Sequence, residues 1–479
     1  MDKPAAHKLC EGFPHQEDYA AVATYIGSGV LSVRGGGRVR CRFRADQDPD
    51  GRIQIVFSSI SAPDFVNHLR SLFEGGINAH FRGLTDDHIE VAAKCVGGRA
   101  LALDRDGSGT VYFAPHALKT FPELKGNATE QECKFLVANF AFSPFTQLGE
   151  HPHHPPPHIF PLDLDGQRIE LEIHPLDDYV DRIVRLQQAR SILPTASLIV
   201  KADAAMPVMW HHDLASKLCR LISVAAGTLV EWISADGFDP ELNKHYRFHS
   251  KRVTKPFCSL PTVPIKEFSY QANTHILRTF LQAGLKGFGQ RDDQYLDSVI
   301  AAFLDARLEG DFLETRGIKT AVTLEIIKNG FVDTFISEQW NSTMPAALRK
   351  QVVRVTKAAL KAEGLSAETI NIAAQALGQL ERPPLRRIVD HMLSTLSLSQ
   401  DKVAVDAVVA IRNRLVHTGQ FISNNNAKKA NQFQITDAVN EFYMLLSFVD
   451  RLLLRILGHA GPSIDYSSSN RSGVQMVIS

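Results

Sequence analysis

The sequence predicts an α+β chain in which a β-rich N-terminal part precedes a helical C-terminal part. Between residues 20 and 175, short alternating or β-branched segments recur between turn residues such as Gly35-Gly36-Gly37 and Asp48-Pro49-Asp50-Gly51. From about residue 293, apolar residues recur at helical spacing in longer segments joined by short loops. We therefore expect residues 1–290 to form a β-rich domain, either a sandwich or barrel-like, and residues 291–460 to form an all-α bundle.

Eight N-terminal segments have the composition of strands. They are Val22–Ser32, Arg38–Arg44, Arg52–Ile60, Asn78–Leu84, His88–Cys95, Thr110–Ala114, Cys133–Phe142 and Gln167–Ile173. Residues 176–290 mix types, and we assign them to the same domain. Helices are expected at Asp178–Arg190 and Asp213–Val230, and strands at Ser197–Lys201 and Tyr246–Val253. The triple glycine is not a phosphate loop, because no Lys-Ser/Thr follows it and a strand comes next in place of a helix.

Seven later segments show the apolar periodicity of helices. They are Tyr295–Leu308, Phe312–Lys328, Ala346–Ala362, Ala367–Leu380, Leu385–Ser394, Lys402–His417 and Thr436–Leu457. Pro383-Pro384 separates two of them, and Asn424 to Lys429 reads as a polar loop. Residues 461–479 are rich in Gly and Ser, and we expect them to be disordered.

The composition indicates a cytoplasmic protein without a membrane anchor. The chain has 52 basic and 52 acidic residues, so net charge gives no pointer to nucleic acid. Six cysteines are scattered without a Cys-x2-Cys pair, which argues against a structural zinc site and suits a reducing cytosol. The first twenty residues are no signal peptide, and no apolar run reaches the ~18 residues that a membrane span needs.

Two histidine-containing segments allow either a purely structural interpretation or a functional one. Residues His151 to His158 hold four histidines that could bind a transition metal, but the interspersed prolines favour an extended connector. Trp210-His211-His212-Asp213 contains possible ligands or acid/base groups without an identifiable partner. We interpret it as the start of a helix, with Asp213 near the first turn.

The stretch from Ala410 to Gly419 contains arginine, asparagine and histidine, which are residue types that often take part in catalysis. Val403, Val408, Ile411 and Leu415 lie close to one helical face, and Gly419 stands where a helix often stops. Arg412, Asn413 and His417 should therefore lie in the last turns. At roughly 100° per residue, Asn413 and His417 are about 40° apart, whereas Arg412 and His417 are about 140° apart. Arg412 and His417 can meet only if the last turn distorts or a second copy contributes.

Arg412, the polar Asn413 directly after it, and His417 resemble the Arg-x4-6-His motif of HEPN ribonucleases. The run Arg-Asn-Arg-Leu-Val-His-Thr-Gly, followed by a long apolar helix, is most similar to the HEPN domain of ApeA-type anti-phage proteins, over about residues 290–460. The resemblance implies a metal-independent endoribonuclease of abortive infection, with no cofactor and with RNA, tRNA among the expected targets, as substrate. It implies a homodimer whose β-rich domain senses a phage-derived trigger.

The resemblance also assigns roles to individual residues. Arg412, Asn413 and His417 would be catalytic, and Arg414, Lys428 and Lys429 would contact RNA. Histidine suits the proton transfers because its pKa lies near neutrality, and the planar guanidinium of arginine suits the phosphate. The alternative for Arg412 and His417 is that they only complement the dipole at a helix C-terminus. The protein would then be a non-catalytic helical scaffold for dimerisation or nucleotide binding.

Charge is locally sorted in the helical part. Residues 340–420 contain eleven Lys/Arg and six Asp/Glu, a net charge of +5 on a neutral chain. A basic face of this kind suits phosphate binding. It also suits an ordinary solvated helix, and the sequence leaves both interpretations open.

Overall fold

The structure is a computed structural model of the chain, and the chain divides into two compact units. One comprises residues 1–259 and 266–274, and the other comprises residues 260–265 and 275–479. The residues described are 21–33, 37–58, 78–96, 98–103, 109–113, 115, 117–120, 129–141, 155–164, 166–189, 192–238, 244–250, 260–265, 268–340, 345–378, 383–399, 401–467 and 475–477.

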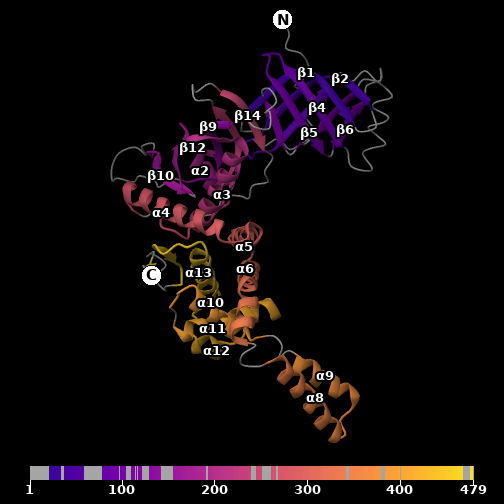
Figure 1. Cartoon of the computed structure of the whole chain (residues 1–479), viewed down its shortest axis with the longest axis vertical. Helices are drawn as coiled ribbons and strands as arrows, with labels where there is room; N and C mark the ends of the chain where they lie inside the picture. The colour runs from indigo at the N-terminus through magenta and orange to yellow at the C-terminus, as the bar shows by residue number, and fades with distance from the viewer. Residues whose placement is uncertain are drawn as a thin grey trace. The chain divides into compact units, whose positions relative to one another are not determined.

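The first unit is built on one antiparallel sheet (Figure 1). Its order is β10-β11-β12-β9-β13-β14-β8-β5-β4-β1-β2-β3-β7-β6, and the described strands do not close into a barrel because β10 and β6 are its two ends. The strands are β1 Ala23–Val33, β2 Gly37–Gln47, β3 Ile53–Ser58, β4 Asn78–Thr85, β5 Glu90–Val96, β6 Gly98–Leu103, β7 Gly109–Phe113, β8 Ala117–Thr120, β9 Thr129–Ala138, β10 His158–Leu164, β11 Gln167–Pro175, β12 Pro194–Pro207, β13 Glu231–Phe238 and β14 Lys244–Ser250. The expected β-rich N-terminal part is confirmed.

Alternating side chains from β1 to β5 and β8 form one hydrophobic core. The ring centroid of Phe81 lies 4.7 Å from that of Phe43 and 4.8 Å from that of Phe57. A Cβ at Gly83 would lie 2.5 Å from the Phe81 ring and 2.8 Å from the Phe43 ring. Glycine at this position of β4 therefore lets the rings pack directly on the backbone.

Helix α3 (Val208–Ala226) packs against β9, β12 and β13. It begins directly after Pro207, five residues before Asp213, so the interpretation of Asp213 as the start of this helix is wrong. The physical reason is that proline has no backbone N–H to leave unpaired and has a fixed φ, so it is suited to a helix start. His211 and His212 therefore lie inside α3, where both are buried and bonded within the same unit.

The second unit is helical, and its central helix is α6, which packs against α5, α10, α11 and α13. The helices among the described residues are α2 Tyr179–Ala189, α3, α4 Tyr270–Gly289, α5 Asp293–Asp305, α6 Leu313–Phe335, the π-helix η2 Ile336–Trp340, α8 Ala346–Ala362, α9 Ala367–Gly378, α10 Leu385–Thr395, α11 Lys402–Thr418, α12 Ala427–Gln432 and α13 Ala438–Ile456. None of the described helices is both long and apolar enough to cross a membrane. The expected helical C-terminal part is confirmed.

Helix α4 was not expected, and it places the division of the chain before residue 290. The helix begins in the first unit and continues in the second from His275. A Cβ at Gly287 would lie 3.1 Å from the carbonyl oxygen of Leu457, and the Phe280 ring lies 5.3 Å from that of His459. The second half of α4 is therefore packed against residues 457–459, directly after α13.

The segment after α13 is ordered where it is described. Strand β15 (Ser463–Asp465) pairs with β16 (Gln475–Val477). The Ile464 N–H donates to the carbonyl of Thr262 at 2.9 Å, and the Tyr466 ring stacks on Tyr443 at 5.6 Å. The expected disorder is therefore wrong for residues 461–467, because apolar and aromatic side chains among them pack on the bundle. Residues 468–474 and 478–479 lie outside the described residues.

A buried ion pair joins the end of α5 to α13. The side chains of Arg307 and Asp450 are each 1% exposed and form an ion pair. Burial raises the pKa of Asp450, and the neighbouring Arg307 opposes that shift. The Arg307 guanidinium also lies 3.6 Å from the centre of the Phe303 ring. Charge and packing together fix this corner of the bundle.

His158 is the one histidine of the 151–158 segment that is described. It opens β10, is 3% exposed, stacks on Tyr270 with ring centroids 5.5 Å apart, and its Nδ1 lies 2.7 Å from the Thr274 hydroxyl. Burial lowers the pKa of His158 from 6.5 to about 4. The imidazole is thus neutral in the folded protein at pH values where it would be protonated in an unfolded chain.

This burial predicts a loss of stability in acid. As the pH falls from 6.5 to about 4, the unfolded chain binds a proton at His158 that the folded protein does not. The folded state should therefore lose about 3 kcal/mol relative to the unfolded chain over that range. His158→Phe keeps the buried ring and removes the titration. Its melting temperature, relative to wild type, should rise as the pH is lowered from 8 to 4.5. A constant difference between the two proteins would contradict the assignment.

Candidate functional site

Helix α11 has the boundaries that the site requires. The Asp401 carboxylate accepts a hydrogen bond from the Val403 N–H at the N-terminus, as a capping residue does. At the C-terminus Gly419 has φ 68°, and its N–H donates to the Leu415 carbonyl at 2.8 Å. The left-handed conformation, which glycine adopts at little cost, ends the helix. His417 therefore lies in the last turn, as expected.

One face of α11 is buried in the bundle. Val408, Ile411 and Leu415 are on it, as expected, together with Val405 and Ala407. Val403 is 47% exposed and is not part of this face. The physical reason is helical rotation, because at about 100° per residue Val403 lies about 140° from Val408. The buried face fixes the rotation of the helix and so the directions of the polar residues near its end.

Arg412 is held between α11 and α6. Its side chain is 16% exposed and forms an ion pair with Glu325 of α6, whose other oxygen pairs with Lys328. Its Nη1 donates to the side-chain oxygen of Asn413 at 2.8 Å. The Nε of Arg412 is buried and has no hydrogen-bond partner among the described residues. The guanidinium is therefore oriented on two sides, by Glu325 and by Asn413.

Glu325 is a site residue that the sequence analysis missed. It lies 87 positions before Arg412, so no local spacing links the two. The only available signal is a single acidic residue within the apolar run Thr323 to Ile327 of a helix. The structure shows that this carboxylate, shared by Arg412 and Lys328, sets the position of the guanidinium.

His417 and Arg412 are not brought together in one copy of the chain. His417 is exposed, and among the described residues nothing donates to it or accepts from it. Asn413 is half-buried, and its oxygen is used by Arg412. No hydrogen bond joins Asn413 to His417 among the described residues. The divergence of about 140° between Arg412 and His417 agrees with the partly buried position of one and the exposure of the other.

The loop after α11 is fixed from α13. Glu441 is fully buried, and its carboxylate accepts from the N–H groups of Ile422 at 2.7 Å and Ser423 at 3.0 Å. Phe421 is buried against α6, where a Cβ at Gly317 would lie 2.7 Å from the ring. A rigid loop therefore follows His417, although His417 itself is exposed.

The expected RNA-contacting residues lie in two different settings. Arg414 is half-buried, and its Nε has no hydrogen-bond partner among the described residues. Lys428 and Lys429 are exposed. They do not lie in a polar loop as expected, because Asn426 accepts from the Lys429 N–H at 3.0 Å and caps the short helix α12. Their side chains therefore project from a helix with a fixed backbone.

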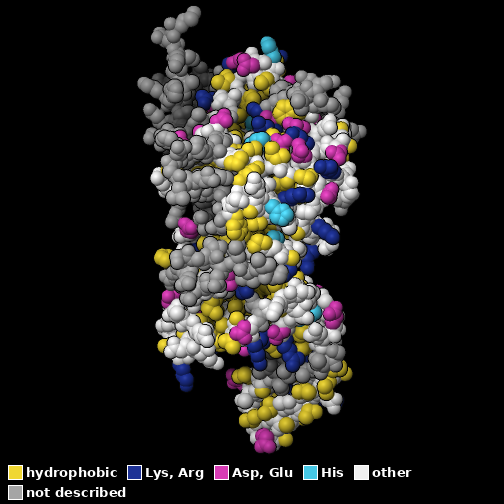
Figure 2. Space-filling model, turned by 90° about the vertical axis from the view of Figure 1, so that its left-hand side faces the viewer, with side chains coloured by type: hydrophobic (Ala, Val, Ile, Leu, Met, Phe, Trp, Pro, Cys, Tyr) yellow, Lys and Arg dark blue, Asp and Glu magenta, His cyan; other side chains and the backbone are white. Residues whose placement is uncertain are grey.

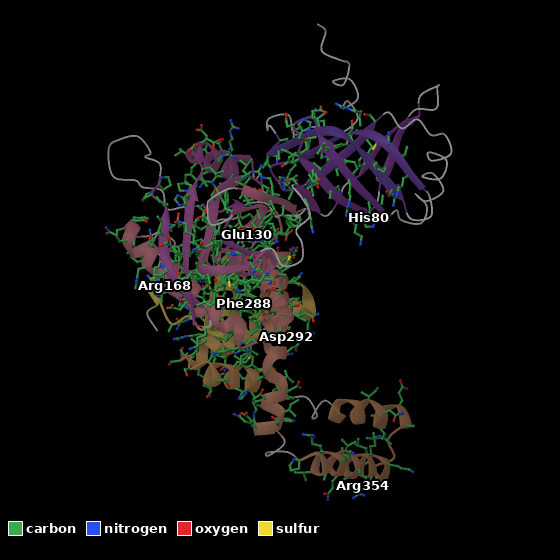
Figure 3. All side chains as sticks on the ribbon, turned by 45° about the horizontal axis from the view of Figure 1, so that its top comes forward. His80, Glu130, Arg168, Phe288, Asp292 and Arg354 are labelled. Carbon is green, nitrogen blue, oxygen red and sulfur yellow. The ribbon has the colours of Figure 1, made fainter. Side chains whose placement is uncertain are left out.

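Helix α8 carries a basic surface apart from Arg414, Lys428 and Lys429. It contains five basic and no acidic residues, and none of its residues is buried. Lys350, Arg354, Lys357 and Lys361 are exposed and fall within an arc of about 60° on the helix. α8 packs against α9, and Figure 3 shows Arg354 on α8. On the face of the molecule in Figure 2, by contrast, basic and acidic side chains are interspersed.

No group of His, Cys, Asp and Glu with the arrangement of a metal site occurs among the described residues. His151, His153 and His154 lie outside them, and His158 is buried in the first unit. Three described cysteines, Cys41, Cys133 and Cys219, are buried and form no disulfide with one another. Burial raises the pKa of the Cys41 thiol to about 11 and that of Cys133 to about 12, so both thiols stay protonated near neutrality.

No family model, no curated protein and no solved structure matches the chain significantly.

Proposed function

We propose that the protein is a metal-independent endoribonuclease of the HEPN type, with Arg412, Asn413 and His417 as its catalytic residues. The observation that carries the proposal is the end of α11. An exposed histidine without a described partner lies in its last turn, and an arginine oriented by Glu325 lies on the same helix five residues before it. The resemblance of this run to ApeA-type proteins supports a role in abortive infection, with RNA, tRNA included, as the substrate.

The chemistry needs few groups, because the nucleophile is already in the substrate. The 2′-hydroxyl next to the scissile phosphate loses a proton and attacks phosphorus, and the leaving 5′-oxygen gains a proton. His417 is exposed and is suited to transfer these protons. The guanidinium of Arg412 is suited to the charge that grows on the non-bridging oxygens, since it stays protonated and donates in a fork. The products are a 2′,3′-cyclic phosphate and a 5′-hydroxyl.

Glu325 is proposed as a positioning residue that acts through Arg412. Its carboxylate holds one nitrogen of the guanidinium and so fixes the direction of the side chain, while the Nε is buried and is not open to a phosphate. Lys328 pairs with the same carboxylate, so two positive side chains share one negative charge. The local charge of this cluster is therefore +1, which favours an approaching phosphate.

Glu325→Gln tests this role. The substitution keeps the shape and removes the charge, so Arg412 should sample other directions and kcat should fall about tenfold with a smaller change in KM. Glu325→Asp should restore part of the rate. Glu368→Gln, which changes an exposed acid on α9, is the matched control. Full activity or faster cleavage in Glu325→Gln would show that the carboxylate does not position Arg412.

Metal independence is the next expectation. The proposed groups supply both proton transfer and charge stabilisation, so cleavage should persist in EDTA. The 5′ fragments should carry 2′,3′-cyclic phosphates, which mass spectrometry of a short oligonucleotide product identifies. Loss of cleavage in EDTA with recovery on adding Mg²⁺ or Mn²⁺ would contradict the mechanism.

We further propose that the working unit is a dimer, because one copy does not bring Arg412 and His417 together. Two exposed apolar side chains favour a contact near His417. Val416 is 43% exposed, and Phe312 is 84% exposed at the end of α6 that packs beside Leu415. The apolar stripe of α13 is unsuited to the contact, because Phe442, Leu446, Val449, Leu453 and Ile456 are buried within one copy.

The alternative of a non-catalytic scaffold also has an observation in its favour. A partly buried Arg412–Glu325 pair joins α11 to α6, which is a structural use of the arginine. In that case the exposed His417 would have no role, and its substitution would change nothing. The β-rich unit remains the proposed sensor of a phage-derived trigger under the first proposal.

A further inference from the structure

Strand β2 carries a row of arginines on its exposed face. Side chains alternate along a strand, so every second residue of β2 points away from the hydrophobic core. Four of these outward residues are arginines, namely Arg38, Arg40, Arg42 and Arg44, and all four are exposed. Successive arginines are about 7 Å apart along the strand, at about 3.4 Å per residue. Like charges at this spacing repel one another, so the row lowers the stability of the sheet unless anions compensate it.

Acidic residues compensate the arginines at only one end of the row. The Nη1 and Nη2 atoms of Arg42 each lie 3.1 Å from one carboxylate oxygen of Asp86. Arg44 pairs with Asp46 at 2.8 Å. Arg38 and Arg40 have no ion pair and no hydrogen-bond partner among the described residues. The uncompensated charge of β2 therefore lies at Arg38 and Arg40.

The register of the sheet continues this positive charge across the neighbouring strands. β1 lies between β2 and β4, and β5 follows β4. Reading across β2, β1, β4 and β5, one row is Arg38, Ser32, His80 and Lys94, and the next row is Arg40, Val30, Arg82 and Ala92. The charged residues and His80, which is labelled in Figure 3, are exposed. These two rows form a basic strip that contains three arginines, one lysine and no acid.

The middle of the basic strip is low. β1 presents only the short side chains of Ser32 and Val30 there. The strands on its two sides, β2 and β4, are two strand spacings or about 10 Å apart, and both carry long cationic side chains. An extended polyanion that lies along β1 can therefore be contacted from both sides.

The pair of Arg42 and Asp86 shows how this face holds an anion. Both guanidinium nitrogens contact the carboxylate, and Nη1 also donates to the Ser28 hydroxyl of β1 at 3.3 Å. The side chain thus leans from β2 over β1. Phosphate oxygens accept from a guanidinium in the same forked manner. Arg40 and Arg38 present the same group one and two places further along the row, without the acid.

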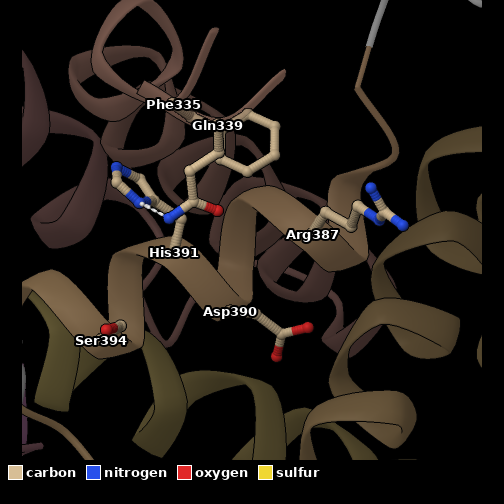
Figure 4. Close-up of a pocket in the computed structure, with 6 residues that line it drawn as sticks. All are labelled: Phe335, Gln339, Arg387, Asp390, His391 and Ser394. Atoms are coloured by element: carbon tan, nitrogen blue, oxygen red, sulfur yellow. Dashed lines mark hydrogen bonds between the residues drawn. The ribbon is translucent and has the colours of Figure 1, made fainter. Parts of the chain in front are cut away.

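Arginines of the helical unit have partners of their own. Arg386 pairs with two carboxylates, and Arg387 lies 5.8 Å from the centre of the Trp340 ring (Figure 4). Neither an acid nor an aromatic ring contacts Arg38 or Arg40 in the described part of the chain. Their exposed guanidinium groups therefore remain available to an external anion.

We propose that the basic strip binds a single-stranded nucleic acid through its sugar–phosphate backbone. The strand would lie along β1, with successive phosphates on Arg38 and Arg40 and with the cations of β4 on its other side. Neither row contains Phe, Tyr or Trp for base stacking, so binding should depend little on base sequence. RNA and DNA share the phosphate backbone, and the test separates them. The proposal does not rest on the proposed nuclease, whose residues lie in the other unit.

The test measures fluorescence anisotropy of labelled probes with the full-length protein. The probes are oligouridylate with 2′-O-methyl groups, oligothymidylate of the same length, a DNA duplex and polyglutamate. The methyl groups remove the nucleophile, so cleavage does not disturb the titration. At least one single strand should bind more tightly than the duplex and polyglutamate. A preference for one of the two single strands would identify the strip as an RNA site or a DNA site.

Substitutions locate the binding on β2. The double variant Arg38→Gln/Arg40→Gln should bind about tenfold more weakly or worse, as loss of charged hydrogen bonds predicts. The plot of log affinity against log salt should become less steep by about 1.4, because each phosphate contact on a single strand contributes about 0.7. Arg168→Gln, which removes an exposed arginine from β11 of the same unit (Figure 3), is the matched control and should bind as wild type.

Four results would overturn the proposal. They are no binding of either single strand, unchanged binding in the double variant, equal weakening in Arg168→Gln, and tighter binding of the duplex or polyglutamate than of the single strands. Each of them leaves the cleavage experiments on His417 unaffected, because the probes are not cleaved and the substituted residues lie in the β-rich unit.

Discussion

His417→Ala should lower the rate of RNA cleavage by about 10²- to 10⁴-fold, the usual effect of removing a group that transfers protons in the transition state. The melting temperature should stay within about a degree of wild type, because the side chain is exposed and bonded to nothing described. The comparison is made on one RNA substrate at equal protein concentration. The same substitution should relieve any growth arrest caused by overexpression.

The matched control is His275→Ala, which removes an exposed histidine from α4. It should cleave at the wild-type rate. If His417→Ala also cleaves at that rate, the histidine is not catalytic and the scaffold alternative is favoured. A loss of activity that follows a loss of folded protein would equally remove support for catalysis.

Arg412 needs a different variant, because it is less exposed than the sequence suggests. Alanine would leave Glu325 with Lys328 as its remaining described partner and cost about 1–3 kcal/mol. Arg412→Lys keeps a charge beside Glu325 but loses the planar fork that binds two phosphate oxygens. Its stability should stay close to that of wild type while cleavage falls. A lysine variant with full activity would show that only the charge is needed.

The parts of the site that follow from sequence are those set by local physics. Gly419 and the apolar spacing of Val408, Ile411 and Leu415 fixed the end and the buried face of α11, and the structure agrees. The sequence does not predict the side-chain contacts that depend on residues far apart in the chain. Arg412 pairs with Glu325 of α6 and donates to Asn413, and no local spacing in the sequence links Glu325 to Arg412.

The same distinction holds for the fold. Strand alternation located most of the sheet, since the side chains of β3 and β9 alternate between core and surface. Helix α4 escaped notice because Gly284, Gly287 and Gly289 weaken its local helical signal. Gly287 is there for a tertiary reason, the close approach to Leu457. A packing requirement made far along the chain therefore overrode local propensity.

A catalytic site shared between two copies predicts opposite results for two heterodimers. Two differently tagged chains are co-expressed, and heterodimers are isolated through both tags. In a shared site the Arg412 of one copy works with the His417 of its partner, so a dimer has two such pairings. A heterodimer of Arg412→Ala with His417→Ala keeps one intact pairing and should cleave at about half the wild-type rate. A heterodimer of wild type with the double variant keeps none and should be inactive.

A site within one copy predicts the reverse for both heterodimers, although each contains the same two substitutions. Destabilisation by Arg412→Ala is therefore the same in both heterodimers, and the comparison reports only how the substitutions are distributed between the two chains.

Phe312→Ser should weaken the dimer and cleavage together, because the side chain is 84% exposed and contributes little to the fold of one copy. Ile372→Ser, at a 61% exposed position on α9, should change neither. A protein that stays monomeric by light scattering and still cleaves at the full rate would exclude the shared site. The partly buried position of Arg412 and the exposure of His417 would then require α11 to distort in its last turn when RNA binds.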